Sequence, residues 1–259
     1  MILRLAFTTL LAATLSAQDS EVPLALNLPT AETLRDWQPA IRFTHRFLEQ
    51  ARSNGKEAFG LDGGNSAGLG LDLGIGAVPG LNAQIYRTAD GKTVVLALQQ
   101  QALKTSWLRL AVRGERFDET IKRATYGNTT VGISGAVLQV PVDFLAGPLA
   151  VGLVPTLLTR TSTKESSVAT YGASLRWSIS EGQSLLLEHY SKPGGLPASG
   201  TYRSGLAFGY RFQTQRHRFT LLGTTAQGTT AHQVLGGGYN GGPVEPGQWT
   251  LGFNLVRMF

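Results

Sequence analysis

One short stretch contains residue types that could carry out nucleophilic chemistry. In EHYSKPGG, residues 188–195, His189 and Ser191 are two positions apart, so both would point to the same face of an extended strand. A serine hydroxyl becomes a nucleophile when a neighbouring base takes its proton and a third group orients that base. Glu188 is the nearest acid, but as the adjacent residue it faces the other side of the strand. Ser191 and His189 are therefore a candidate catalytic dyad that lacks its third member within the stretch.

A second set of residues could act through charge. Arginines recur in extended segments on the faces that carry small or polar side chains: Arg42, Arg46, Arg109, Arg113, Arg176, Arg203, Arg211 and Arg218. The clear acidic counterparts in these segments are Asp72 and Glu188. A passage lined with arginine favours small anionic solutes. Alternatively, the arginines could pair with loop acids such as Asp118 and Glu119 and fill the space that they face.

The elements that would position these residues are β-strands, because apolar and polar side chains alternate over most of the chain. Twelve segments show this pattern: Trp37–Phe47, Ser66–Ile75, Leu81–Arg87, Lys92–Gln100, Ser106–Arg113, Thr130–Val140, Leu149–Leu157, Val168–Ser178, Gln183–Tyr190, Arg203–Phe212, His217–Thr224 and Trp249–Phe259. Most have the length of a tilted strand that crosses a bilayer. Thr230–Tyr239 could be an extra strand or part of a loop.

The longest apolar run, Val137–Leu158, could be mistaken for a transmembrane helix. It contains Pro141, Pro148 and Pro155, and each proline would remove a helical hydrogen bond. Two strands on either side of a turn at Pro141–Pro148 are the better interpretation.

The links between the predicted strands alternate in length. Long polar links such as residues 48–65 and 225–248 alternate with short ones such as 76–80 and 179–182, and only residues 88–91 are short where a long link is expected. Long loops at one end and tight turns at the other are typical of an all-β, antiparallel transmembrane β-barrel of the outer membrane. The alternative is a secreted soluble β protein whose apolar strand face forms its core.

The N-terminus predicts export. Arg4 precedes an apolar stretch, Leu5–Leu15, and small residues follow at Ser16 and Ala17, as in a cleaved secretory signal. We therefore expect a signal peptide at 1–17, a periplasmic N-terminal segment at 18–36 and the β-barrel at 37–259.

The composition argues against several other classes of protein. Only 15% of residues are charged. Because no cysteine is present, neither disulfides nor thiolate metal sites are expected. The net charge is +6, but the arginines are scattered, which argues against nucleic-acid binding. The four histidines are too dispersed for a metal site, and we expect no metal and no cofactor.

The C-terminal segment keeps its alternation to the last residue. Apolar residues occupy one face: Leu251, Phe253, Leu255 and Phe259. A closed barrel has no free edge, so its last strand must pair with the first. This ending resembles the C-terminal signature of bacterial outer-membrane proteins, which implies recognition by the barrel-assembly machinery. Arg257 departs from the pattern on the same face.

Two further stretches resemble an uncharacterised family of bacterial outer-membrane β-barrel proteins. These are AIRFTHRF (residues 40–47) with FGLDGGNSAGLGLDLGI (59–75), and the terminal LGFNLVRMF. The resemblance implies a barrel surrounded by outer-membrane lipid, and it implies no activity.

The stretch EHYSKPGG also resembles the motif of lipid A 3-O-deacylases and, more loosely, that of outer-membrane phospholipase A. This implies a lipid-facing ester hydrolase as an alternative function. The chain has Lys192 where the deacylase motif has asparagine, and Tyr202 and Arg203 stand where the third catalytic member is usual. We expect a non-enzymatic outer-membrane barrel, either a narrow pore for small solutes, anionic ones among them, or a structural or binding platform.

Overall fold

The computed structural model describes residues 22–47, 65–89, 92–123, 129–159, 167–191, 204–226, 228–236 and 249–259. The strands are β1 (Pro39–Phe47), β2 (Asn65–Ile75), β3 (Leu81–Thr88), β4 (Val94–Lys104), β5 (Leu108–Arg123), β6 (Thr129–Gln139), β7 (Val142–Ala146), β8 (Leu149–Leu158), β9 (Val168–Ser180), β10 (Gln183–Tyr190), β11 (Gly205–Gln213), β12 (His217–Thr224) and β13 (Thr250–Met258). A short helix, α2 (Ala231–Leu235), lies between β12 and β13. Within these ranges no helix is long and apolar enough to cross a membrane. The predicted signal peptide lies outside the described residues.

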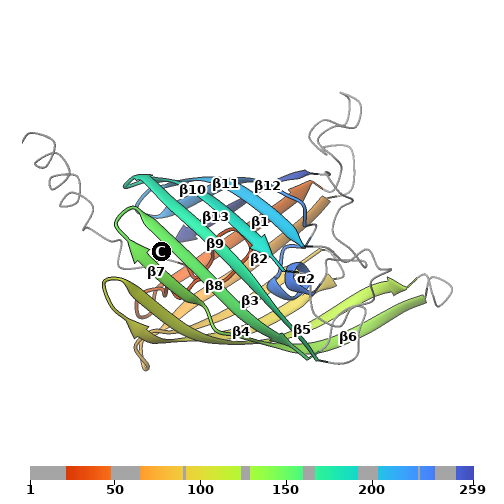
Figure 1. Ribbon diagram of the computed structural model, residues 1–259. Coiled ribbons are helices and arrows are strands. Elements are labelled where there is room, and N and C mark those ends of the chain that lie inside the picture. The colour runs from red at the N-terminus through yellow and green to blue at the C-terminus, as the bar shows by residue number, and fades with distance from the viewer. Residues whose placement is uncertain are drawn as a thin grey trace, which may run out of the picture.

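The strands form a closed barrel (Figure 1). Each strand pairs antiparallel with its neighbours, and the ring closes where β1 pairs with β13. β6 and β7 are two parts of one strand, because both pair with β5 in one unbroken register, with Gln139 opposite Arg113 and Val142 opposite Leu110. Pro141 separates the two parts, since it has no N–H to donate to the ladder. The predicted antiparallel barrel of twelve strands is therefore confirmed.

Three sequence predictions about the connections need correction. The turn predicted at Pro141–Pro148 is shorter, because β7 occupies most of it and the chain reverses at Gly147, whose φ is 60°. β5 continues to Arg123, so part of the predicted long link after Arg113 is strand. In the stretch Thr230–Tyr239, the described residues form α2 rather than a strand, and its apolar side chains are buried.

The links separate by length at the two ends of the barrel, as predicted. We call the end with the tight turns β2–β3, β4–β5, β7–β8, β9–β10 and β11–β12 the turn end, and the opposite end the loop end. Both the start of β1 and the end of β13 lie at the turn end, where Ala40 pairs with Met258. Three exposed tryptophans also lie near the turn end: Trp37, Trp107 and Trp177.

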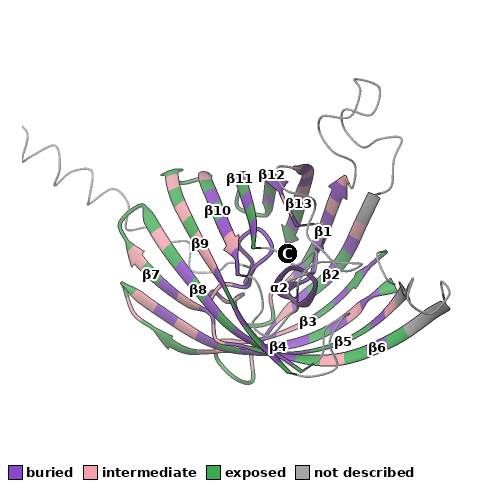
Figure 2. Cartoon of the chain, turned by 45° about the vertical axis from the view of Figure 1, so that its right-hand side comes forward, coloured by how far each residue is buried: buried purple, intermediate pink, exposed green. Residues whose placement is uncertain are grey.

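Burial alternates along every strand and so defines an outer and an inner face (Figure 2). The outer face carries large apolar side chains such as Leu71, Phe208 and Phe212, whereas the inner face carries polar ones such as Asp72 and Arg211. This arrangement suits a lipid exterior and a polar interior. On β5 the outward side chains become polar at Arg116 and Asp118, which form an exposed pair towards the loop end.

The last strand is held on both sides. β13 pairs with β12 and with β1, and the backbone N–H of Phe259 donates to the carbonyl of Pro39 at 3.0 Å. On the outer face the ring of Phe253 lies 5.8 Å from that of Phe43, and the guanidinium of Arg257 lies 4.9 Å over the ring of Phe259. The terminal segment is thus an ordered strand that closes the barrel.

Candidate functional site

The barrel interior is the candidate functional site, because strand alternation directs the polar side chains into it. Seven of the eight arginines singled out in the sequence are described, and all face the interior: Arg42, Arg46, Arg109, Arg113, Arg176, Arg211 and Arg218. Arg203 lies outside the described residues. The interior also holds six carboxylates: Glu32, Asp72, Glu115, Glu119, Asp143 and Glu188. Buried charges need partners, and the contacts below supply them.

Residues 22–36, which we call the inserted segment, enter the barrel: residues 22–34 lie inside it, whereas Arg35 and Asp36 are exposed next to β1. At the turn end, Val22 packs against Val256 and Met258. From there the segment runs inward to an apex near Leu26–Leu28 and then returns to the turn end, where β1 begins. The sequence predicted a periplasmic N-terminal segment at 18–36, whereas residues 22–34 of that segment lie within the barrel. The physical reason is that its leucines pack into the barrel and its peptide groups find partners on the wall.

Glu188 holds the apex of the inserted segment. Its carboxylate accepts hydrogen bonds from the backbone N–H groups of Leu26, Asn27 and Leu28 at 2.6 to 3.1 Å. The hydroxyl of Tyr190 donates to the same carboxylate at 2.5 Å. Glu188 is fully buried, and hydrogen bonds from several donors compensate for the desolvation of such a charge.

Side chains of β11, β12 and β13 bind the carbonyl groups of the same stretch. The contacts are Arg211 with the carbonyl oxygens of Leu24 (3.2 Å) and Ala25 (2.6 Å), Arg218 with those of Val22 (3.2 Å) and Leu24 (3.3 Å), and Asn254 with that of Leu26 (2.7 Å). Arg46 donates to the side-chain oxygen of Asn27 at 2.7 Å. The wall therefore satisfies both donors and acceptors of the inserted backbone.

A second group of contacts holds the inserted segment closer to the turn end. The Glu32 carboxylate lies 2.8 Å from the Arg109 guanidinium and 3.2 Å from that of Arg176. The Asp143 carboxylate accepts the N–H of Ala31 at 2.7 Å. Two of the predicted lumen arginines, Arg109 and Arg176, thus contact the inserted segment through Glu32. Arg211 and Arg218, described above, contact it through its main chain.

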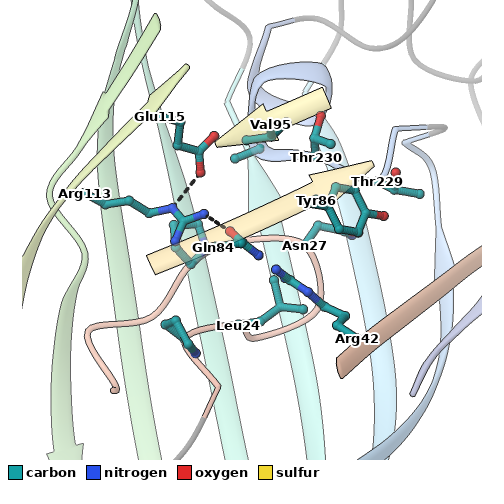
Figure 3. A pocket seen from close by; sticks show the side chains of 13 residues that line it. Leu24, Asn27, Arg42, Gln84, Tyr86, Val95, Arg113, Glu115, Thr229 and Thr230 are labelled. Carbon is teal, nitrogen blue, oxygen red and sulfur yellow. Dashed lines mark hydrogen bonds and ion pairs between the residues drawn. The ribbon is translucent and has the colours of Figure 1, made fainter. Parts of the chain in front are cut away.

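On the opposite side, two arginines contact only the wall by the described hydrogen bonds and ion pairs. The Arg42 guanidinium lies 3.4 Å from the Asp72 carboxylate and 5.2 Å from the Tyr86 ring centroid. Arg113 donates to Glu115 at 2.6 Å and also to Gln84. Figure 3 shows both arginines beside Leu24 and Asn27 of the inserted segment.

These arginines border a cavity of about 30 Å³ between the wall, the inserted segment and residues 229–231. Among the described residues, the buried Nε of Arg42 and one carboxylate oxygen of Glu115 have no hydrogen-bond partner. Unpaired buried polar atoms are expected to bind water or a small polar solute. The cavity has room for one or a few waters.

Residues 225–226 and 228–236 cover the interior from the loop end (Figure 1). In α2, the ring of His232 stacks on that of Phe117 with centroids 3.9 Å apart, and its Nε2 lies 3.2 Å from a carboxylate oxygen of Glu119. The side-chain amide of Gln233 donates to Glu119 at 3.4 Å. Of the two loop acids expected to fill the interior, Glu119 contacts α2, whereas Asp118 faces outward.

The structure does not bring Ser191 and His189 together as a dyad. The Ser191 hydroxyl lies 2.9 Å from that of Thr170 and accepts the N–H of Tyr171 at 2.9 Å. His189 lies on the outer face, with its ring centroid 6.2 Å from that of Tyr171. Within the described ranges, no hydrogen bond joins the two candidate residues. Lys192, Tyr202 and Arg203 lie outside these ranges.

Among the described residues, no group of three or more His, Cys, Asp or Glu side chains is placed to hold a metal ion. The dispersal of the histidines explains this in part, since His45 stacks on Phe253 on the outer face at 5.4 Å while His232 lies inside.

Sequence reasoning missed the inserted segment and Glu32. A signal was present, because VPLALNLP, residues 22–29, places apolar side chains at every second position of a stretch that was expected to be exposed. Such a run in a lead segment predicts burial. Where it would be buried could not be read from the pattern.

Two solved structures share this architecture. A structure titled NanC porin superposes with a TM-score of 0.52 at 7% identity, and a KdgM porin does so with 0.52 at 8%; each match covers 85% of this chain and 99% of the other. Outer membrane phospholipase A from Escherichia coli matches with a TM-score of only 0.43 at 12% identity, over 96% of both chains, which supports no argument about activity. These identities are low enough that the likenesses show the fold alone.

The sequence comparisons agree with the fold. A search of curated proteins finds no match. Residues 143–259 match the sequence model of a family described as a membrane bound beta barrel domain. The resemblance to an uncharacterised family of β-barrel membrane proteins is thereby confirmed, and the similarity extends over residues 143–259.

Proposed function

We propose that the protein is a non-enzymatic outer-membrane channel for small solutes, with a preference for anions. The observation that carries the proposal is the pair Arg42 and Arg113 at the cavity between wall and inserted segment. The similarity in fold to two structures titled porins supports a channel. The described interior has seven arginines and six carboxylates, so its fixed charge is positive.

The route that we propose runs between β1–β5 and the inserted segment. The arginines on the other side of the interior are occupied by main-chain carbonyls or by Glu32, whereas Arg42 and Arg113 face the cavity. Because the cavity has room only for a few waters, conduction of larger solutes requires the inserted segment or residues 225–236 to move.

The cellular location is part of the same proposal. An N-terminal signal at 1–17, an apolar outer face and the segregation of tight turns from long loops support export and insertion into the outer membrane, surrounded by its lipid. The turn end would then face the periplasm.

Current through single barrels in a planar bilayer tests the proposal. With a salt gradient, the reversal potential of the natural protein should show anion preference, and Arg42→Glu with Arg113→Glu should move it towards cation preference. Arg116→Glu is the matched control, because Arg116 lies on the same strand as Arg113 but faces outward. A folded barrel that carries no current, or a reversal potential that both variants leave equal, would contradict the proposal.

No described contact favours the ester hydrolase alternative. The hydroxyl of Ser191 is bound to Thr170 and Tyr171 instead of a base. We therefore do not extend the proposed function to acyl chemistry.

A further inference from the structure

The wall around the apex recognises polypeptide backbone. Every hydrogen bond described between the wall and the backbone of residues 24–28 comes from a wall side chain: Glu188 accepts from three N–H groups, and Arg211, Arg218 and Asn254 donate to carbonyls. Asn27 alone adds polar side-chain contacts, to Arg46 and Tyr190. Recognition of this kind depends on backbone conformation more than on side-chain identity.

Two glycines of the wall shape pockets for leucine side chains. A Cβ at Gly209 would come within 2.6 Å of a Leu26 methyl, and a Cβ at Gly172 within 2.6 Å of both Leu28 methyls. The leucines therefore occupy space that exists only because these strand positions lack side chains. The pockets select apolar side chains two residues apart.

The inserted segment does not form part of the sheet. Residues 22–28 make no ladder pairing with any strand, and their own backbone bonds are local, such as Ala25 N–H to the Leu28 carbonyl at 2.9 Å. The parts of the segment before and after the apex both lead to the turn end. It can therefore leave the site without breaking a strand pairing of the barrel.

We propose that Glu188, Arg211, Arg218 and Asn254, with the pockets at Gly172 and Gly209, form an exchangeable binding site for extended peptide. The chain's own residues 22–28 fill this site. The ligand class is an uncharged peptide with leucine-like side chains two residues apart, which enters from the turn end. This inference does not depend on conduction, so a failure of the channel proposal would leave it standing.

The first test measures release of the chain's own segment. The protein has no cysteine, so Leu28→Cys introduces a single thiol, and a water-soluble maleimide can react with it only when the segment leaves its pocket. Adding Glu188→Gln removes the charge that accepts the three N–H groups and should speed labelling by about tenfold. Glu115→Gln is the matched control, because Glu115 is a buried wall acid that pairs with Arg113 and not with the segment.

The second test measures exchange. Once a bulky maleimide is attached to residue 28, the segment cannot return, and a fluorescent peptide with the uncharged sequence of residues 22–30 should bind with raised anisotropy. A peptide of the same composition in scrambled order should not bind, and the alkylated variant with Glu188→Gln should bind the first peptide at least about tenfold more weakly. A heat-dependent mobility shift on SDS gels verifies folding of each variant.

Either of two results would overturn the inference. One is equal labelling rates with Glu188→Gln and Glu115→Gln in folded barrels, which would make the segment a permanent part of the core. The other is an alkylated barrel that does not bind the peptide, or that binds the scrambled peptide with equal affinity. Neither readout involves ion current.

Discussion

Glu188 shows how one interior residue organises the space around it. Its position on β10 turns it inward, away from the outward Leu187 and His189. Once inside, it is too far from water to remain charged without donors, and the three N–H groups of the inserted segment meet that need together with Tyr190. A residue that the sequence presents as a neighbour of a candidate dyad is instead the anchor of the apex.

Gly172 allows a prediction at the residue scale. Gly172→Ala places a methyl 2.6 Å from both Leu28 methyls, so the segment must shift, and overpacking of this kind costs about 1–3 kcal/mol of stability. The temperature at which the folded gel band disappears should fall. Gly114→Ala is the control on another strand, because a Cβ there meets nothing within 4 Å. Equal transition temperatures for the two variants would show that Leu28 is not packed against Gly172.

Among the elements, β13 has the most consequence for assembly. It closes the ring by pairing with β12 and β1, and its outward face carries Leu251, Phe253, Leu255 and Phe259. We propose that these residues serve as the assembly signal read by the barrel-assembly machinery in cells. The sequence predicted the strand, and the structure adds the bond from Phe259 to Pro39 that fixes its end.

A substitution at the last residue tests this element. Phe259→Ser should lower the amount of heat-modifiable barrel recovered in the outer membrane by several-fold, because the assembly signal loses its terminal aromatic. Phe212→Ser is the matched control, since Phe212 is a similarly exposed outward aromatic near the same end. If both variants assemble equally, the terminal position has no special role.

At the scale of the whole molecule, the outer face forms an apolar surface with tryptophans near its rims. Trp37, Trp107 and Trp177 are 64%, 58% and 50% exposed and lie near the turn end, and Trp249 precedes β13 at the loop end. Tryptophan prefers the boundary between lipid and water, where its apolar ring and N–H are both satisfied. The distribution predicts a barrel that crosses the bilayer with its ends near the two interfaces.

Fluorescence in lipid vesicles checks this orientation. Tryptophan emission of the reconstituted barrel should be quenched more strongly by lipid brominated near the headgroup than by lipid brominated near the chain end. Detergent-unfolded protein mixed with the same vesicles provides the baseline. Emission typical of water-exposed indole, with no quenching by either lipid, would show that the apolar face does not contact lipid.

Much of the fold could be predicted because its signals are local. Alternation with a period of two places Leu71 outside and Asp72 inside whatever their distant neighbours are, and link length sorts the ends without knowledge of the pairing. The errors arose where one residue type fits two kinds of structure. Pro141 was predicted to begin a turn, but it interrupts a strand whose register with β5 continues on both sides.

The sequence by itself determined the barrel, its strand number, the two faces and the inward direction of the arginines, since each follows from neighbours along the chain. Only the tertiary structure decided what those arginines contact. The bond from Glu188 to Leu26 joins residues 162 positions apart, and no local pattern encodes such a pairing. Whether a polar interior stays open or is filled depends on which distant segment reaches it, and here residues 22–36 do so because closure of the ring brings their partners within reach.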